Sequence, residues 1–491
     1  MGLGKVVKGG LWLYLSNLTN NVLGFFYWLI ISAIGGASLL GVTSAVVSLA
    51  AMINMSLGLG VAAGLQRFIG YYIGENNTEK IYEYFWTSFY FRLLVYVSAG
   101  TAIILLAKSN FMFIGMQPEM LQAVGIIVIL SSLNIFMTIP VSFIKIKIIF
   151  LSSLVSQITK ITVGITLVYL GFGWRGAVLG AISYTLVYTT FLSLQSLKII
   201  KLRKIFNINA LKDVMIAGLS SWLPATIATI AQRSGIISVF GTSGASETGY
   251  YYVATQISNV VIMLGSSILS LLLPFLSSIK DGRKRANWQA LRISLAVMTP
   301  VLFFLVYYPW LPLSLLGKEY VSASPILVIL LLGGLPLAIT LAVNNLVFSY
   351  GCYRYVLAIG LFQNIPRVVL YSLLVPLYHG TGAAISVTIG SLMGLIASSI
   401  IAYKISYRIR WKEIVCILAP PLLFGAICRL LNISWMLGII FIIILSALVY
   451  AKLGIITKKD LRELSISIIP QEKLQKIIPY IKPVIDVLYE T

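Results

Sequence analysis

The chain has 491 residues, of which 59% are hydrophobic and only 10% are charged. A soluble globular domain carries about 25% charged residues, so this composition excludes cytosolic enzymes and nucleic-acid-binding proteins and indicates a membrane protein. The formal net charge of +22 is therefore interpreted through membrane topology before any partner is considered. The three cysteines and the single histidine, His379, show no disulfide or metal-ligand spacing, so we expect no metal site and no cofactor.

Fourteen segments are apolar over about 20 residues, the length that an α-helix needs to cross the hydrocarbon layer. They lie at residues 10–34, 39–64, 84–107, 120–144, 148–170, 177–197, 214–240, 249–276, 292–316, 323–350, 356–377, 382–402, 414–431 and 435–451. The predicted fold class is an all-α polytopic membrane protein with about 14 transmembrane helices. The first segment is too long for a signal-peptide core, so we expect it to be a retained helix.

Basic residues orient these helices, because the cytoplasmic loops of membrane proteins are enriched in lysine and arginine. With both termini cytoplasmic, the external side carries only Lys108, Arg175, Lys318 and Arg429. Four more basic residues fall inside predicted helices, and all the others fall on the cytoplasmic side. The sequence therefore predicts a multi-pass protein of the cell membrane with both termini in the cytoplasm.

An internal repeat is indicated by two external turns. Gly36, Ala37 and Ser38 join the first two helices, and the same three residue types recur 208 residues later, between the seventh and eighth helices. An even six helices separate the turns, so we predict two six-helix lobes related by a pseudo-two-fold axis along the membrane normal. The predicted domains are residues 1–200 and 201–411 for the lobes, 412–452 for helices 13 and 14, and 453–491 for a cytoplasmic amphipathic tail.

Basic residues inside the predicted helices are the strongest candidates for a binding site. Each costs about 2.5–3.5 kcal/mol at a helix centre, unless it snorkels or caps a backbone carbonyl. Arg92 is shallow enough to do either, whereas Lys160 and Arg367 lie near mid-depth and Arg233 lies in the outer third of its helix. None of the 14 acidic residues is predicted at mid-depth. The sequence therefore indicates a cavity that receives a negative group, such as a phosphate or diphosphate.

Neutral amide side chains are candidates for binding a sugar or lining the cavity, namely Asn17, Asn20, Asn21, Gln157, Gln232 and Asn364. The three asparagines share one helix face by their spacing. Hydrogen bonds between helices explain such amides equally well. The tyrosine run from Tyr250 to Tyr252 lies at a predicted helix end, where we expect it to anchor the protein at the membrane interface.

Three short patterns carry a family resemblance. They are Gly41 and Val42 after the first helix, residues 247–254 (Glu-Thr-Gly-Tyr-Tyr-Tyr-Val-Ala) entering the eighth helix with Pro274 near its end, and residues 316–320 (Leu-Gly-Lys-Glu-Tyr) before the tenth. Together they resemble the MOP superfamily of exporters, specifically its polysaccharide and oligosaccharide lipid flippase branch, which is Wzx-like and related to MurJ and to MATE exporters. Many members carry an Asp-Arg pair in the seventh helix, but this chain has Gln232 and Arg233, which keeps the cation and loses the acid.

The resemblance implies a flippase, not an enzyme, that moves a polyprenyl-(di)phosphate-linked oligosaccharide from the cytoplasmic to the external leaflet by alternating access. Arg233, Lys160, Arg367 and Arg92 are expected to bind the anionic head group. The expected partners are this lipid-linked substrate and membrane lipids, without nucleic acid, and the protein is expected to be monomeric. A MATE-like multidrug or metabolite exporter is the alternative. A glycan polymerase or ligase is a weaker alternative, because the external loops are short.

Overall fold

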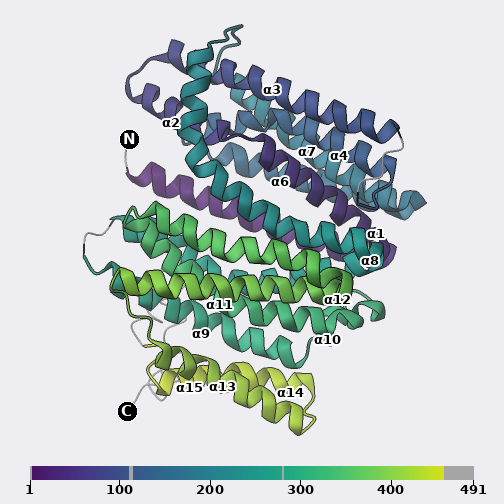
Figure 1. Ribbon diagram of the computed structural model, residues 1–491, viewed down its shortest axis with the longest axis vertical. Coiled ribbons are helices and arrows are strands. Elements are labelled where there is room, and N and C mark those ends of the chain that lie inside the picture. The colour runs from purple at the N-terminus through teal and green to yellow at the C-terminus, as the bar shows by residue number, and fades with distance from the viewer. Residues whose placement is uncertain (1–2, 110–113, 279–280, 458–491) are drawn as a thin grey trace, which may run out of the picture. The chain divides into compact units, whose positions relative to one another are not determined.

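The computed structural model describes residues 3–109, 114–278 and 281–457 of the chain. All regular elements within these residues are helical, as the sequence predicts (Figure 1). Ten continuous segments of the described residues are long and apolar enough to cross a membrane. The predicted amphipathic tail lies almost entirely outside the described residues, from residue 458 onwards.

Four of the ten spans contain an interior break in helical geometry. Three of these breaks lie at Gly36 in α1 (Leu3–Leu57), at Gly244 in α8 (Ile208–Ser278) and at His379 in α12 (Tyr353–Lys404). Between α6 (Lys147–Leu167) and α7 (Gly173–Leu197), Gly171 breaks the short π-helix η2 (Val168–Phe172). Each break lies in a connection that the sequence places outside the membrane. The count of fourteen transmembrane helices stays a prediction, because the continuous spans number ten.

The remaining elements are shorter or unbroken. They are α2 (Val61–Gly74), α3 (Thr78–Lys108), α4 (Pro118–Ser131), η1 (Ser132–Met137), α5 (Thr138–Ser142), α9 (Arg283–Tyr307), α10 (Trp310–Ser314), η3 (Lys318–Ala323), α11 (Ser324–Ser349), α13 (Trp411–Leu430), α14 (Trp435–Ile439), η4 (Ile440–Ile444) and α15 (Leu445–Lys452).

The predicted ninth helix, residues 292–316, is wrong at both ends. α9 begins nine residues earlier, at Arg283, because the helix extends into polar sequence beyond its apolar part. A search for apolar segments does not detect such an extension. It ends at Tyr307 because Pro309 lacks a backbone N–H and disfavours helical geometry at the residue before it. Arg292, which is the first residue of the predicted helix, therefore lies nine residues inside α9.

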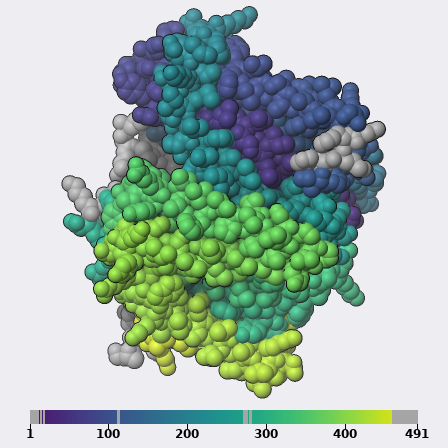
Figure 2. Space-filling model, viewed as in Figure 1, coloured from purple at the N-terminus to yellow at the C-terminus, as the bar shows by residue number. Residues whose placement is uncertain are grey.

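The chain forms two compact units. The first consists of residues Met1–Tyr252 and Val368–Ala383, and the second of Val253–Arg367 and Ala384–Thr491. In the first unit α6 packs against α1 and α7, and α3 packs against α4 (Figure 1). In the second unit α9 packs against α11 and α13. Yellow-green atoms of the C-terminal helices are visible at the surface in Figure 2. On α13, large apolar side chains such as Leu423 are exposed, as expected for a helix that contacts lipid. The predicted lobe boundaries stay a prediction.

The two turns of the internal repeat, at Gly36 and at Gly244, pack against each other within the first unit through reciprocal backbone contacts. A Cβ atom added to Gly41 would lie 1.8 Å from the carbonyl oxygen of Ala245, and one added to Gly249 would lie 2.0 Å from that of Ala37. Gly249 occupies the position in the second turn that Gly41 occupies in the first, and the same holds for Ala245 and Ala37. In both directions, therefore, the glycine of one turn contacts the alanine carbonyl of the other turn.

The backbone conformation at the two breaks repeats as well. Gly36 has φ 69° and ψ −176°, and Gly244 has φ 83° and ψ −175°. Side chains of L-residues disfavour this region, so both positions require glycine. The internal repeat thus extends from the sequence of the turns to their dihedral angles.

The segment that connects α7 to α8, residues 198–207, lies along α3, and we call it the strap. The indole Nε1 of Trp86 donates to the carbonyl oxygen of Lys201 at 2.8 Å. One helical turn further on, the hydroxyl of Tyr90 donates to the carbonyl oxygen of Arg203 at 3.2 Å. Arg203 also forms an ion pair with Glu79 at 3.2 Å. The strap is therefore fixed to the first unit along its length.

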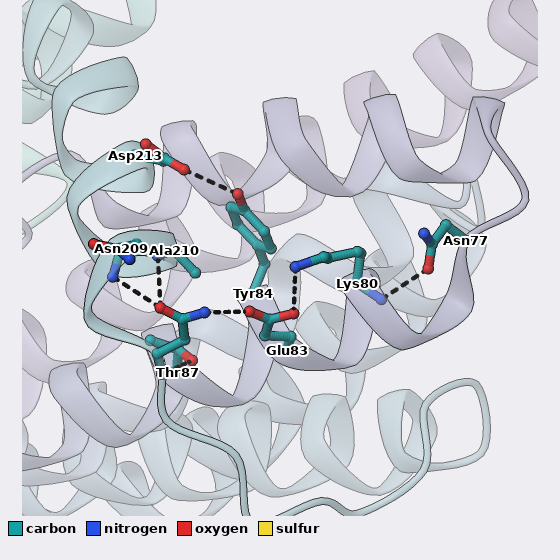
Figure 3. Close-up of polar contacts among 9 residues, drawn as sticks. Asn77, Lys80, Glu83, Tyr84, Thr87, Asn209, Ala210 and Asp213 are labelled. Atoms are coloured by element: carbon teal, nitrogen blue, oxygen red, sulfur yellow. Dashed lines mark hydrogen bonds and ion pairs between the residues drawn. The ribbon is translucent and has the colours of Figure 1, made fainter.

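Asn207 ends the strap and links it to α8 through the polar network of Figure 3. Its amide Nδ2 donates to Glu83 at 2.5 Å, and the other carboxylate oxygen of Glu83 pairs with Lys80 at 2.8 Å. Its Oδ1 accepts from the backbone N–H of Asn209 at 2.9 Å, which caps the start of α8. In the same network the hydroxyl of Tyr84 donates to Asp213 of α8 at 3.0 Å.

We expect Gly41→Ala and Gly249→Ala each to lower the melting temperature of the detergent-purified protein. The added methyl group meets a backbone carbonyl that no rotamer change can move, and such overpacking costs about 1–3 kcal/mol. Gly24→Ala in α1 is the matched control, since nothing lies within 4 Å of its Cβ position. The control should be neutral or slightly stabilising. Melting temperatures that do not change at Gly41 and Gly249 contradict the reciprocal contact.

The strap makes a second prediction. Trp86→Phe keeps a ring but removes the donor to Lys201, so we expect trypsin to cut the strap about two- to tenfold faster in membrane vesicles, as loss of one hydrogen bond implies. Digestion followed by mass spectrometry reports the rate. Tyr82→Phe on the same helix is the control, because its hydroxyl makes no hydrogen bond within the described residues. Equal cleavage rates in all three proteins contradict the fixed strap.

Candidate functional site

Two parallel helices of the first unit, α1 and α6, form the framework of the candidate site. The hydroxyls of Ser16 and Ser153 lie 3.0 Å apart, and Nε2 of Gln157 donates to Oδ1 of Asn20 at 3.1 Å. Both pairs are separated by 137 residues, so the two helices run in register. The spacing of four residues on each helix places these contacts along one line.

Asn20 and Gln157 form a hydrogen bond between two helices. For these two amides the structure thus shows the helix-to-helix bond that the sequence offers as the alternative to sugar binding. This bond leaves Oε1 of Gln157 buried without a hydrogen-bond partner within the described residues. A buried acceptor with no partner is costly and has capacity for a donor from outside the chain. This oxygen is therefore the amide group of the framework that is best placed to accept a hydrogen bond from a ligand.

Lys160 lies one turn beyond Gln157 on α6, and its ammonium group rests on aromatic rings of α1. Its Nζ lies 4.3 Å from the ring centroid of Tyr27 and 5.0 Å from that of Trp28. These distances are typical of cation–π interactions. Lys160 is only partly buried, whereas Tyr27 and Trp28 are 0% and 8% exposed. Part of the Lys160 residue is thus accessible, while the two rings that its ammonium group contacts are enclosed.

Arg233 of α8 connects to the same aromatic residues through Tyr252. The rings of Trp28 and Tyr252 meet edge to face at 5.1 Å, and Arg233 interacts electrostatically with Tyr252. We call Tyr27, Trp28 and Tyr252 the aromatic cluster. It links Lys160 and Arg233 by a continuous chain of contacts inside the first unit.

The electrostatic setting of these two cations differs from that of cations at helix ends. At the ends, Arg175 pairs with Glu119 and Arg410 pairs with Glu413. Lys160 and Arg233 form no ion pair with any residue that the structure describes. No described acidic residue therefore neutralises their charge.

Arg92 has the structural role that the sequence offers as its alternative. Its guanidinium donates to the carbonyl oxygen of Ser131 at 3.2 Å and lies 4.4 Å from the ring centroid of Tyr96. The hydroxyl of Tyr96 in turn donates to the carbonyl oxygen of Asn54 at 2.7 Å. Arg92 thus connects α3 to α4 and does not join the aromatic cluster. Its role in binding a head group stays a prediction.

The other predicted residues are dispersed. Arg367 and Asn364 belong to the second unit, where Arg367 packs beside Gly390 and the amide of Asn364 donates to the carbonyl oxygen of Gly360 at 2.9 Å. Asn21 and Gln232 are exposed. The side chain of Asn17 lies outside the described residues, although its backbone is part of α1.

The aromatic cluster is the part of the site that the sequence prediction misses. Interface anchoring is wrong for Tyr252, which is 6% exposed and packs on Trp28. Tyr27 lies seven residues after Asn20 and therefore shares its helix face. This spacing marks the ring as a candidate on the polar face of α1, but the residue of α6 that it meets is set by packing.

Solved structures with a similar fold include a lipid flippase and transporters of the MOP superfamily. The lipid II flippase MurJ, in an inward closed conformation, aligns with 90% of this chain and 98% of its own, at a TM-score of 0.74 and 14% identity. An inward-facing multidrug resistance MATE family transporter of the MOP superfamily covers 79% of this chain and 94% of its own, at 0.60 and 15%. A MOP superfamily transporter from Pyrococcus furiosus covers 82% and 95%, at 0.56 and 17%. The chain therefore has the fold of MOP superfamily transporters and is a multi-pass membrane protein.

A comparison of the sequence with protein-family models identifies the family of this chain. Residues 45–325, more than half of the chain, match the family described as polysaccharide biosynthesis protein. The chain belongs to this polysaccharide biosynthesis family, which confirms the resemblance to the polysaccharide branch of the MOP superfamily. No curated protein sequence matches the chain.

Proposed function

We propose that the protein is a flippase for a polyprenyl-(di)phosphate-linked oligosaccharide. The substrate moves from the cytoplasmic to the external leaflet of the cell membrane, in polysaccharide or glycoprotein glycan biosynthesis. The polysaccharide biosynthesis family supports the glycan, and the MOP transporter fold supports transport without a chemical reaction on the substrate. The protein acts as a monomer by alternating access, with both termini in the cytoplasm.

The single observation that carries the proposal is the pair of unneutralised cations around the aromatic cluster. Burying a charge without a counter-ion is costly, and an anionic ligand removes that cost by supplying the counter-ion. Lys160 and Arg233 supply two positive charges within one set of contacts, which suits a phosphate or diphosphate carrying two or more negative charges. A cationic drug would be repelled by the same two groups.

The neutral part of the substrate is assigned to the amides. Oε1 of Gln157 accepts a hydrogen bond from a sugar hydroxyl, and Asn20 holds Gln157 in place. Asn17, Asn21, Gln232 and Asn364 contribute further polar contacts. Arg367 of the second unit and Arg92 of α3 attract the head group during its passage. The prenyl chain stays in the bilayer, because each CH₂ group removed from lipid into water costs about 0.8 kcal/mol.

The proposal is tested by Lys160→Gln and Arg233→Gln in proteoliposomes, with a fluorescent polyprenyl-diphosphate oligosaccharide whose leaflet is read by a membrane-impermeant quencher. Each loses one hydrogen bond to a charged group, worth about 1.5–3 kcal/mol, so transport should fall roughly ten- to hundredfold. Lys108→Gln and Arg354→Gln, at exposed positions near helix ends, are the matched controls and should transport normally.

Two outcomes contradict the proposal. Folded Lys160→Gln and Arg233→Gln proteins that flip the lipid at the wild-type rate exclude the cationic site. Wild-type protein that fails to flip the lipid but exports an amphiphilic cation favours the MATE-like exporter.

A further inference from the structure

We infer that Tyr27 is a positioning residue for Lys160: its ring holds the ammonium group in place without neutralising it, which keeps the full charge available to an anionic ligand. The inference rests on the proposed function, since it concerns the same head-group site. It adds a role for a residue that carries no charge and that the sequence does not single out.

The ring of Tyr27 is fixed on three sides. Its hydroxyl donates to the carbonyl oxygen of Ala177 on α7 at 2.8 Å. A Cβ atom added to Gly164 of α6 would lie 2.6 Å from that hydroxyl oxygen, and one added to Gly180 of α7 would lie 2.9 Å from it. The ring of Tyr27 therefore occupies a notch that exists only because α6 and α7 both carry glycine at this level. With 0% exposure, it has no room for another rotamer.

The lysine, in contrast, has no other anchor at its charged end among the residues that the structure describes. A lysine side chain is a flexible four-carbon stem that carries a compact charge, so its position depends on what the ammonium group contacts. The described contacts of Nζ are the faces of Tyr27 and Trp28, at 4.3 and 5.0 Å. Because the ring of Tyr27 is immobile, it defines where the charge is held.

An aromatic face suits this task better than a carboxylate. A carboxylate would hold the ammonium group equally firmly, but the pair would be neutral and would compete with an incoming phosphate. A ring attracts the cation through its quadrupole and has no net charge. The lysine and the ring together therefore keep a net charge of +1. The arrangement positions the cation and leaves its attraction for an anion intact.

Trp28 extends the arrangement toward α8. It contacts both the ammonium group of Lys160 and the ring of Tyr252, and Tyr252 interacts with Arg233. The two cations are thus positioned against one cluster of rings. The ligand class that matches them is a prenyl-linked phosphate or diphosphate, for which the aromatic cluster offers no competing negative charge.

A double-mutant cycle in detergent tests the inference, with farnesyl diphosphate as the probe and farnesol as its uncharged counterpart. Tyr27→Leu removes the ring and should weaken farnesyl diphosphate binding about three- to thirtyfold while farnesol binding is unchanged. Tyr27→Phe keeps the ring and should bind within about twofold of wild type. In a Lys160→Gln background, Tyr27→Leu should cause no further loss, because Tyr27 acts through Lys160.

The outcomes separate the inference from the proposed function. If Lys160→Gln itself leaves farnesyl diphosphate binding unchanged, the cationic site of the proposed function is wrong. If Lys160→Gln weakens binding but Tyr27→Leu does not, or weakens it equally in both backgrounds, the positioning role alone is wrong. Should Tyr27→Leu fail to fold, Trp28→Leu replaces it in the same cycle, and a loss that depends on Lys160 supports the aromatic hold.

Discussion

Backbone polar groups in the hydrocarbon layer must be hydrogen-bonded within the protein, because lipid offers them no partner. Helices meet this requirement internally, so how closely two of them approach is decided by side-chain size. At Gly41 and Gly249 the chain omits side chains and backbones meet directly, whereas at Gly164 and Gly180 the freed space is filled by the ring of Tyr27. The position of Lys160 therefore depends on glycines at matching levels of α6 and α7.

Charge is treated differently at the ends and in the interior of the helices. Near the ends, cations such as Arg175 and Arg203 pair with acids, in a setting where water screens both partners. Inside the spans, Arg92 and Lys160 lie on aromatic rings, which stabilise a cation without adding a second ion to desolvate. Arg92 also bonds a backbone carbonyl and so serves the packing of helices. Lys160 has no such bond within the described residues.

The helices and the breaks within the long spans could be predicted because apolar length and turn-forming residues are local properties of the sequence. The ends of α9 could not, since Arg283 continues a helix that has already left the apolar region. Lys160 and Arg233 could be singled out because depth follows from counting residues along a helix. Their aromatic surroundings could not, because the ring that meets Lys160 depends on the register between α1 and α6, which packing sets across 137 residues.

The reciprocal contact at Gly41, Ala245, Gly249 and Ala37 has the form of an interface in a symmetric dimer, where residue i meets residue j and j meets i. A surface of this kind is self-complementary. A shorter polypeptide with only one of the two turns would carry both the glycine and the alanine positions, and two copies of it would fit together at this point. The long chain thus contains, as an internal contact, a pairing of two turns that has the symmetry of an interface between identical copies.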